Sequence, residues 1–354
     1  MLPLRAAGAP ARSVAVVIPA RNESDVIETS IASLSTQEYS GSLSIFVVDD
    51  ESEDGTAEIA KRAAAIGSAT TQISVIRSRP LPSGWTGKMW AVAQGVEEAL
   101  ATHPDYVLLT DADIVHPANS IGMLVSLAEA QDLSLASVMV KLKTDTFAER
   151  ALIPAFTFFF FLLYPPAWIR NSRRKTAGAA GGCILVRPSA LTRAGGIAAI
   201  RNEIIDDCAL ARIIKRSGGR VWLGISSDIT SLRGYGRASA IGRMIARTAY
   251  NQLHHSPFLL VGTIAGLFLT FLLPLFLLMN ANSTLRILGA VAWLLMTLAF
   301  LPTVRFHRLP LLWAVSLPVA AAFYSGATIY SAIQFHAGRG GQWKGRAQDS
   351  AHAS

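Results

Sequence analysis

Two aspartates one residue apart, Asp111 and Asp113, end the apolar run in YVLLTDAD. Two carboxylates that face one pocket repel each other unless a cation lies between them. Mg²⁺ or Mn²⁺ suits such a pair, because these hard cations prefer carboxylate oxygens and complete their shell with diphosphate oxygens. A lone pair of this kind more commonly forms a solvated turn, so the metal interpretation depends on the motifs around it.

A second acidic pair, Asp206 and Asp207, opens a helical pattern that runs through Leu210 and Ile213. The dipole of a helix keeps a carboxylate near its N-terminus ionised. An ionised carboxylate suits a general base, which must be unprotonated near neutral pH. The alternative is that one of the two aspartates caps the helix, and both roles can hold, one each.

Lys88 follows a loop that contains two glycines, PSGWTG, and stands at the start of a helical pattern. Glycines let the backbone approach a phosphate, and the lysine can neutralise its charge. The spacing is not that of a Walker A motif, so a P-loop is not supported. The alternative is a surface loop with a solvated lysine.

Two polar stretches follow the first two apolar runs of the chain. The first is PARNE at residues 19–23, and the second is DDESEDGT at residues 49–56. The PARNE turn can face a ligand, although Asn22 can instead cap the next helix. Asp50 can accept a hydrogen bond from a base imide or a ribose hydroxyl. No G-x-G-x-x-G follows the first run, so dinucleotide binding and hydride transfer lose their support.

Alternating strands and helices must position these motifs. We expect strands at residues 14–19, 45–50 and 106–111, and helices at residues 25–36, 56–66 and 87–101. The alternation predicts an α/β fold with a mostly parallel sheet, in which ligands bind beyond the carboxyl ends of the strands. The run SLASVMV, from residue 134, is a further candidate strand.

The composition indicates a membrane protein. Of 354 residues, 51% are hydrophobic and 16% charged, which is too apolar for a purely soluble chain. The net charge of +8 comes from Lys and Arg spread over loops and membrane flanks, so we expect no nucleic-acid partner. Anionic lipids and an anionic substrate explain the charge instead. The two cysteines lack the spacing of a disulfide framework or a zinc site, which favours a reducing compartment.

Three candidate membrane spans lie in the second half of the chain, at about residues 257–280, 286–303 and 310–335. They contain no Asp, Glu or Lys to form an ion pathway, which disfavours a transporter. The apolar segment 151–169 is interrupted by prolines, so we interpret it as an interfacial or re-entrant helix, with a spanning helix as the alternative. The basic run at residues 170–175 would then meet lipid headgroups, unless it is a solvated loop.

The distribution of arginines predicts the sidedness of the membrane segments. Arginines before the first span and in the RFHR loop after the second predict cytoplasmic sides. Three spans would place the basic tail GRGGQWKGR outside, against the same rule. Either the third segment is a hairpin around Pro318, or the tail disobeys the rule, or another span lies upstream.

These observations predict the following organisation. We expect a flexible N-terminus at residues 1–12, a cytosolic catalytic domain at 13–250, a membrane domain of about three helices at 257–335, and a basic tail at 336–354.

The motifs, taken in order, resemble those of the family 2 glycosyltransferases, which have the GT-A fold of nucleotide-diphospho-sugar transferases. The order VVIPARNE, VVDDESEDGT, GK, DAD, a Gly-Gly-Cys stretch and an acidic pair carries the resemblance over about residues 13–250. More narrowly, GWTGKMWA, LLTDADIVH and QWKGR look like the bacterial hopene-associated glycosyltransferases, relatives of the ceramide glucosyltransferases. The resemblance implies a nucleotide-diphosphate sugar donor, and a location at the bacterial inner membrane with the catalytic domain on the cytoplasmic side.

The resemblance also implies a role for each matching residue. The nucleoside pocket would be lined by Pro19, Ala20, Arg21, Asn22, Glu23 and Asp50. Lys88 would lie near the diphosphate, Asp111 would face the ribose and the metal, and Asp113 would bind the metal directly. The Glu-Asp pair of the family corresponds to Asp206-Asp207, because Leu210 follows as in the pattern ED-x-x-L. Asp207 would be the base that deprotonates the acceptor hydroxyl.

Two features depart from the family pattern. The Q-x-x-R-W element of many lipid-directed members is replaced by GRMIART, which contains Arg243 and Arg247 but no tryptophan. The two arginines share one helix face and would grip the leaving diphosphate, or else only flank the first span. Trp343 in the tail can replace the missing tryptophan only if the tail is cytosolic. The sequence also lacks the leading membrane helix that is common among the hopene-associated relatives.

The resemblance therefore predicts an inverting transfer of a sugar to a lipid hydroxyl, with a hopanoid or a sphingolipid-like molecule as the acceptor. One alternative is transfer to a polyprenyl phosphate or a polysaccharide. Another, of a different class, is a catalytically silent GT-A module that acts in membrane assembly or nucleotide sensing.

Overall fold

The computed structural model describes residues 11–66, 71–338, 342–343 and 346–347. Most of the expected flexible N-terminus, and most of the basic tail, lie outside the described residues. The chain forms two compact units. The sheet unit comprises Met1–Leu142, Tyr164–Arg233 and Trp343–Ser354, and the helical unit comprises Lys143–Leu163 and Gly234–Gln342.

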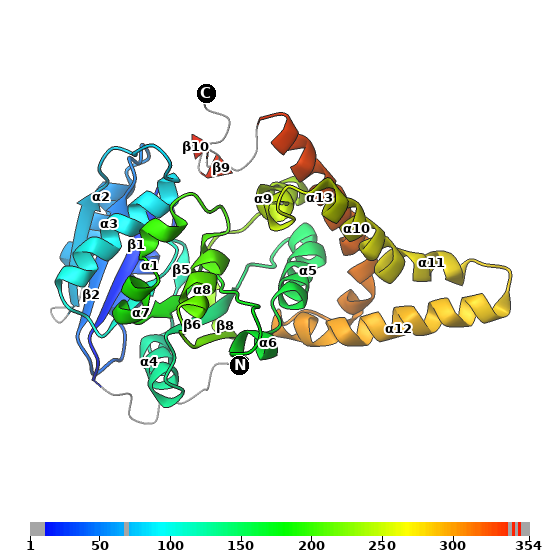
Figure 1. Cartoon of the computed structure of the whole chain (residues 1–354), viewed down its shortest axis with the longest axis horizontal. Helices are drawn as coiled ribbons and strands as arrows, with labels where there is room; N and C mark the ends of the chain where they lie inside the picture. The colour runs from blue at the N-terminus through cyan, green and yellow to red at the C-terminus, as the bar shows by residue number, and fades with distance from the viewer. Residues whose placement is uncertain (1–10, 67–70, 339–341, 344–345, 348–354) are drawn as a thin grey trace. The chain divides into compact units, whose positions relative to one another are not determined.

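The sheet unit is built on one mixed sheet with the strand order β3-β2-β1-β4-β7-β6-β8-β5 (Figure 1). Its strands are β1 (Val14–Ala20), β2 (Leu43–Asp49), β3 (Thr71–Arg77), β4 (Tyr106–Leu109), β5 (Ile114–Val115), β6 (Leu135–Lys141), β7 (Ile184–Val186) and β8 (Val221–Ser231). Strands β3, β2, β1 and β4 run parallel, whereas β7 runs antiparallel to both of its neighbours. The carboxyl ends of β1, β2, β4, β6 and β8 consequently share one edge of the sheet with the start of β7.

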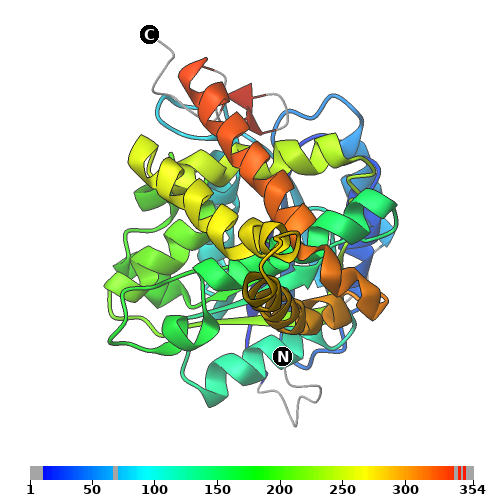
Figure 2. The ribbon, with the colours of Figure 1, turned by 90° about the vertical axis from the view of Figure 1, so that its right-hand side faces the viewer.

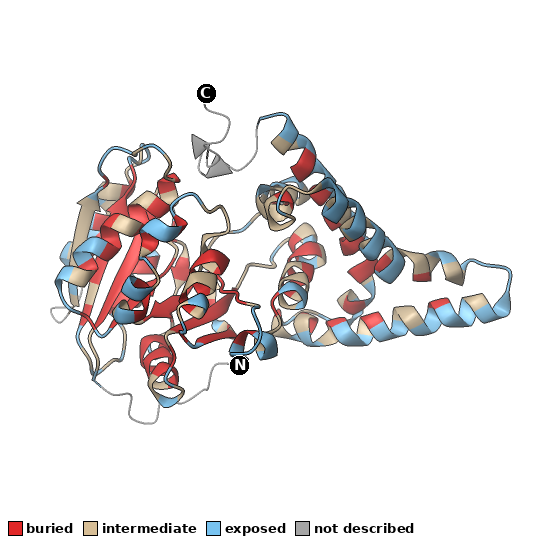
Figure 3. Cartoon of the chain, in the orientation of Figure 1, coloured by how far each residue is buried: buried red, intermediate tan, exposed pale blue. Residues whose placement is uncertain are grey.

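Helices cover both faces of this sheet. They are α1 (Ile27–Ser35), α2 (Thr56–Ile66), α3 (Gly87–Ala101), α4 (Ser120–Ala130), α6 (Pro166–Arg170), α7 (Pro188–Arg193) and α8 (Asp206–Arg216). The apolar sides of α1, α2 and α4 join the core on the face that carries Val16 and Ile18. On the opposite face α3 packs against β1 and β2, and Figure 3 shows these strands buried. Gly95 permits this close approach, because a Cβ there would stand 2.4 Å from Val17.

The predicted α/β fold with a mostly parallel sheet is confirmed. The expected strands correspond to β1, β2 and β4, the run from residue 134 forms β6, and the expected helices correspond to α1, α2 and α3. Strand β3 was not predicted. Its sequence, TQISVIR, lacks a continuous apolar run because the strand lies half-exposed at the edge of the sheet.

The helical unit contains six helices among its described residues. These are α5 (Phe147–Leu163), α9 (Ala238–Gln252), α10 (Pro257–Leu267), α11 (Leu273–Leu278), α12 (Ser283–Phe306) and α13 (Leu317–His336). Helix α13 packs against both α9 and α10 (Figure 2). A π-helical turn, Phe268–Leu272, precedes Pro274 and accommodates the missing N–H of that proline. Pro318 lies in the first turn of α13, where proline is tolerated, so the chain forms no hairpin at this residue.

Four segments are long and apolar enough to cross a membrane among the residues that the structure describes. Three of them, Pro257–Leu278, Ser283–Phe306 and Leu311–His336, match the three expected spans. The fourth is Phe147–Arg170, which contains the segment that we interpreted as interfacial or re-entrant. Large apolar side chains are exposed on α10 and α12, where Figure 3 shows an outer surface coloured as exposed.

Candidate active site

In the sheet unit, the residues that we predicted to take part in catalysis or binding lie together at the shared carboxyl edge of the strands. A pocket at this edge is lined by Lys88, Asp111, Asp206 and Asp207, together with apolar side chains such as Met89. These residues come from α3, from the turn after β4 and from the first turn of α8. Their assembly follows from the topology, because the carboxyl ends of parallel strands and the N-termini of the following helices meet at one edge.

Lys88 links two of the carboxylates in the pocket. Its Nζ lies 3.1 Å from Asp111 Oδ1 and 3.1 Å from Asp206 Oδ2. Burial alone would lower the pKa of Lys88, but the charges of Asp111 and Asp206 outweigh it and raise the pKa. The backbone before Lys88 is fixed by the N-cap of α3, where the Thr86 hydroxyl accepts a hydrogen bond from the Met89 N–H. A positively charged lysine is thus held at the N-terminus of α3.

Asp207 is held by two backbone N–H groups. Its Oδ2 accepts from Gly181 N at 2.9 Å, and its Oδ1 accepts from Cys208 N at 2.7 Å. Burial, followed by the charge of Asp206, raises the pKa of Asp207 to about 7, against the opposing charge of Lys88. A carboxylate with this pKa is a much stronger base than an exposed aspartate, and it still ionises near neutral pH. Neither aspartate is the N-cap of α8, which is Ile205.

Asp113 belongs to the turn between β4 and β5 and lies beside the end of β8, where two side chains contact it. Ser231 Oγ donates to Asp113 Oδ2 at 2.5 Å, and Arg233 Nε lies 4.0 Å from the same oxygen. Arg233 also forms an ion pair with Glu23, in the turn after β1. Burial and the charge of Asp111 raise the pKa of Asp113, whereas Ser231 and Arg233 oppose the rise.

Arg233 was not among the residues predicted for the site. In the sequence it is one of the arginines before the first membrane span. The structure instead places it two residues beyond the end of β8, beside Asp113 and Glu23. The signal that could have found it is its position directly after a strand that ends at the ligand edge, but β8 itself was not predicted.

The turn after β1 is joined to the loop after β2. Asn22 adopts a left-handed backbone conformation with φ 52°. Its side chain accepts from Glu53 N at 2.9 Å, and its own N–H donates to Ser52 Oγ at 3.0 Å. Asn22 therefore fixes the turn and does not cap α1, whose N-cap is Val26.

Asp50 is almost fully buried beside the same turn. Arg21 Nη1 lies 3.7 Å from Asp50 Oδ2 and donates a hydrogen bond to the Asp50 carbonyl. The neighbouring Asp49 has its Oδ1 buried and without a hydrogen-bond partner among the residues described. A buried acceptor with no partner is costly, so a hydrogen-bond donor that reached this oxygen would stabilise the turn. The predicted nucleoside residues Pro19, Ala20 and Arg21 thus lie next to two acidic strand-end residues.

His116 fixes the turn that carries the Asp111-Ala112-Asp113 triplet. Its Nε2 lies 3.0 Å from Thr110 Oγ1, and that hydroxyl donates to the Gly182 carbonyl at 2.8 Å. Burial lowers the pKa of His116 to about 4, so the imidazole is neutral near pH 7. Gly181, next to Gly182, supplies the N–H that holds Asp207. The segment with these two glycines therefore joins the two acidic motifs.

A divalent cation fits Asp111 and Asp113 only together with a bound diphosphate. Within the described ranges, no group of three or more His, Cys, Asp or Glu side chains forms a complete cage for a metal ion. Burial, followed by the charge of Asp111, nevertheless raises the pKa of Asp113, so the two carboxylates repel each other even though Lys88 contacts Asp111 and Arg233 contacts Asp113. Mg²⁺ commonly takes one or two carboxylates from the protein and its remaining ligands from substrate phosphates and water.

The two remaining predicted residues, Arg243 and Arg247, lie on α9 in the helical unit. Both are exposed and stand one helical turn apart on the same face, whereas Ile241 and Ile245 are buried. Their contact with a diphosphate stays a prediction.

Known proteins resemble the chain in sequence and in fold. The chain matches the family described as "Glycosyl transferase family 2" over residues 15–195. It is 26% identical over 177 residues to an N-acetylglucosaminyltransferase of Rhizobium leguminosarum bv. viciae, and the match spans 50% of this chain but only 37% of that relative's length. Its fold is similar to that of the mannosyltransferase PcManGT from Pyrobaculum calidifontis. The TM-score is 0.51 at 18% identity, over 89% of this chain and 87% of that one.

The family match covers more than half of the chain, and the fold agrees with it. The sheet unit has the curled mixed sheet of the GT-A fold, and C-terminal apolar helices that could span a membrane follow it. The chain belongs to glycosyl transferase family 2.

Proposed function

We propose that the chain is a membrane-associated inverting glycosyltransferase that moves a sugar from a nucleotide-diphosphate sugar to a lipid hydroxyl. The observation that carries this proposal is Asp207, a carboxylate with a pKa of about 7, in one pocket with Lys88 and Asp111. A base for a hydroxyl group and a cation for a phosphate are the two groups that such a transfer requires.

Asp207 removes the proton of the acceptor hydroxyl. The hydroxyl oxygen then attacks the anomeric carbon, and the bond from that carbon to the diphosphate oxygen breaks with its electron pair. One displacement inverts the anomeric centre, and no covalent intermediate with the enzyme is needed. The hydrogen bonds from Gly181 N and Cys208 N keep the carboxylate of Asp207 in a fixed orientation while it accepts the proton.

The donor occupies the carboxyl edge of the sheet in this proposal. The nucleoside lies against residues 19–23 and Asp50, and Lys88 contacts the diphosphate. Lys88 forms ion pairs with both Asp111 and Asp206. When the donor binds, a phosphate would replace one of these two carboxylates as a partner of Lys88. Arg243 and Arg247 are proposed as further diphosphate contacts.

Asp111 and Asp113 would hold a divalent cation, Mg²⁺ or Mn²⁺, which when bound supplies positive charge to the departing diphosphate. The similar mannosyltransferase from P. calidifontis is described in complex with GDP-Man and Mn2+, which supports a nucleotide-sugar donor with a cation. Ser231 and Arg233 would then keep Asp113 in place in the absence of the donor.

We propose a lipid acceptor, a hopanoid or a sphingolipid-like molecule, at the cytoplasmic side of the bacterial inner membrane. The four apolar segments support a membrane location, and the motifs that resemble the hopene-associated glycosyltransferases support the lipid class. In this arrangement residues 13–250 form the cytosolic domain, with the apolar segment 151–169 as an interfacial or re-entrant helix, and residues 257–335 form the membrane domain. A polysaccharide or polyprenyl-phosphate acceptor is the second candidate.

Lipid extracts of cells with and without the gene, compared by mass spectrometry, test the proposal. We expect a glycolipid to disappear with the gene and to return when the wild-type gene, but not an Asp207→Asn variant, is restored. An unchanged lipid profile with a lost polysaccharide would favour the second candidate. Absence of both donor hydrolysis and transfer by the purified protein would favour a catalytically silent module.

A further inference from the structure

A basic loop, residues 170–175, lies in the sheet unit and takes no part in the proposed transfer. It follows α6 and reads Arg-Asn-Ser-Arg-Arg-Lys. Its four cationic side chains are all exposed: Arg170, Arg173, Arg174 and Lys175. The loop therefore presents four positive charges within six residues to its surroundings.

Lys215 holds the backbone of the basic loop. Its Nζ donates to the carbonyl oxygens of Trp168 at 3.2 Å, Ile169 at 2.6 Å and Thr176 at 2.7 Å. The three carbonyls belong to the residues on either side of the loop, so one ammonium group closes the loop from within. Asn171 Oδ1 also accepts a hydrogen bond from Arg173 N at 2.9 Å, so the backbone of the loop is held without its four cationic side chains, which are available for a ligand.

The charges of the basic loop have no acidic partner. None of its four cationic side chains forms an ion pair with a residue in the described part of the chain. The guanidinium of Arg174 instead covers the ring of Trp168, at 4.8 Å from its centroid. Four like charges held close together repel one another, so an anionic ligand would lower their free energy.

A hollow beside the loop offers a place for such a ligand. Two arginines, Arg170 and Arg220, line it together with the amide side chains of Asn171 and Gln131. Guanidinium groups bind phosphate oxygens through paired N–H donors, and the amides add further donors. The lining of the hollow therefore suits a phosphate group.

The chain around the loop indicates where the phosphate comes from. The basic loop follows the 24-residue apolar segment Phe147–Arg170, which is long enough to cross a membrane. Tryptophan and arginine at the end of an apolar segment are typical of the membrane interface. Trp168 is 48% exposed in this position. We propose that the basic loop, together with Trp168 and Arg220, binds the phosphate groups of anionic membrane lipids.

A fluorescent probe on Ser172, inside the loop, tests this proposal with the full chain in lipid nanodiscs. A Ser172→Cys variant can be labelled selectively with an environment-sensitive dye, because the native Cys183 and Cys208 are only 0% and 1% exposed. We expect a blue shift of the emission when phosphatidylglycerol is added to phosphatidylcholine discs. High salt should reverse the shift, because exposed charges are screened. Identical emission in both kinds of disc would overturn the proposal.

Two charge-matched variants separate local binding from a bulk charge effect. Arg170→Gln with Arg174→Gln removes two charges from the loop, and Lys61→Gln with Arg62→Gln removes two exposed charges from α2. We expect the first variant to need a several-fold higher lipid fraction for the half-maximal shift, and the second to behave as the parent. Equal loss in both variants would overturn local binding.

Inorganic phosphate added to neutral discs distinguishes the source of the anion. We expect it to leave the emission unchanged, because lipid phosphates are held at high local density whereas free phosphate is not. A shift with phosphate as large as that with anionic lipid would overturn the membrane assignment. None of these measurements requires sugar transfer, so their outcome is independent of the proposed function.

Discussion

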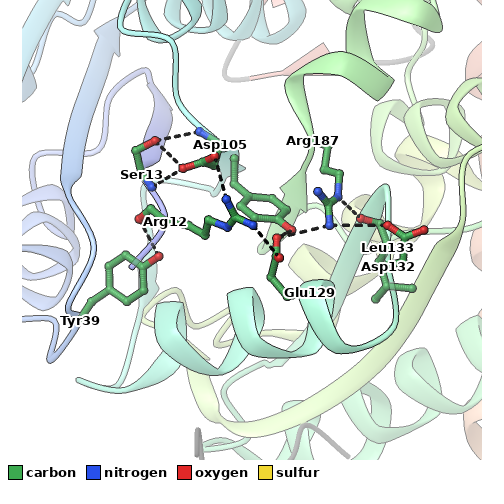
Figure 4. Close-up of polar contacts among 9 residues, drawn as sticks. Arg12, Ser13, Tyr39, Asp105, Glu129, Asp132, Leu133 and Arg187 are labelled. Atoms are coloured by element: carbon green, nitrogen blue, oxygen red, sulfur yellow. Dashed lines mark hydrogen bonds and ion pairs between the residues drawn. The ribbon is translucent and has the colours of Figure 1, made fainter. Parts of the chain in front are cut away.

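The two ends of the sheet in the sheet unit both carry clusters of charged residues, but their charges are balanced differently. At the end opposite the candidate site, Glu129 accepts hydrogen bonds from Arg12 at 3.0 Å, Tyr106 at 2.6 Å and Arg187 at 3.3 Å (Figure 4). The hydrogen bond from Tyr106, followed by the contacts of Arg12, lowers the pKa of Glu129. The Ser13 backbone N–H does the same for the pKa of Asp105.

At the site end, two carboxylates have pKa shifts of the opposite sign. The pKa values of Asp113 and Asp207 are raised, in each case first by burial and then by a neighbouring carboxylate. Lys88, Arg233 and Arg21 contact acidic side chains there. One end pairs its charges and so stabilises the fold, whereas the other keeps an excess of carboxylate; we propose that this excess serves a cation and a proton that arrive with the substrates.

The largest expected effect is that of Asp207→Asn. Removing a general base should lower the rate of sugar transfer by about 10²- to 10⁴-fold. The donor should still bind, because the amide leaves Lys88 and Asp111 unchanged. Radiolabelled sugar transfer measures the first quantity and calorimetry with nucleotide measures the second. Normal turnover in this variant would refute the assignment of the base.

The next effect is that of Asp113→Ala on cation-dependent donor binding. Loss of one of two carboxylate ligands should raise the Kd of Mn²⁺ with nucleotide by at least about tenfold. This factor corresponds to a loss of about 1.4 kcal/mol of binding free energy. Asp25→Ala is the matched control, because Asp25 is exposed beside the same edge of the sheet. Equal losses in both variants would mean that Asp113 has no special role.

A smaller effect concerns pH. Asp207 must be ionised to accept a proton, so kcat/KM should rise as the pH rises through about 7 and level off above it. The charge of Asp206 raises this pKa, so Asp206→Asn should move this rising limb of the pH profile to lower pH. Lys88 lowers it, so Lys88→Met should move the limb to higher pH, in addition to any loss of rate. Limbs that do not move in these opposite directions would contradict the coupling.

The smallest effect on transfer is expected at the opposite end of the sheet. Glu129→Gln should destabilise the fold by about 1–2 kcal/mol, because a partly buried charged acceptor of three hydrogen bonds is lost. Its transfer rate below the unfolding temperature should match the wild type. Asp132→Asn is the control, since the Asp132 side chain is 79% exposed and its ion pair with Arg187 should contribute little. A catalytic defect in Glu129→Gln would remove the distinction between the two ends.

The sequence allowed β1, β2, β4 and β6 to be predicted, because buried strands of this kind are continuous apolar runs. The polar residues that follow β1, β2 and β4 meet at one edge for the same topological reason, so their gathering was also predictable. Prediction failed at the half-exposed edge strand β3 and where the sheet turns irregular. Strand β7 has only three residues, and the second half of β8, SSDITS, is mostly polar.

The contacts within the site were less predictable than its membership. The bridge from Lys88 to both Asp111 and Asp206 joins three segments, and its geometry depends on how α3 and α8 each pack against the short 3-10 helix Ile197–Ile200. The position of Arg233 beside Asp113 depends on β8, which no periodicity revealed. The raised pKa of Asp207 likewise depends on burial, which only the folded structure defines.

Helix α8 carries the proposed base in its first turn and Lys215, which holds the basic loop, in its last. Eight residues separate Asp207 from Lys215, so their backbones are about 12 Å apart at a rise of about 1.5 Å per residue. A lipid bound at the basic loop, as we propose, would have to extend over about this length to offer a hydroxyl to Asp207. The lipid bound at the basic loop and the acceptor lipid would then be separate molecules, recognised at opposite ends of helix α8.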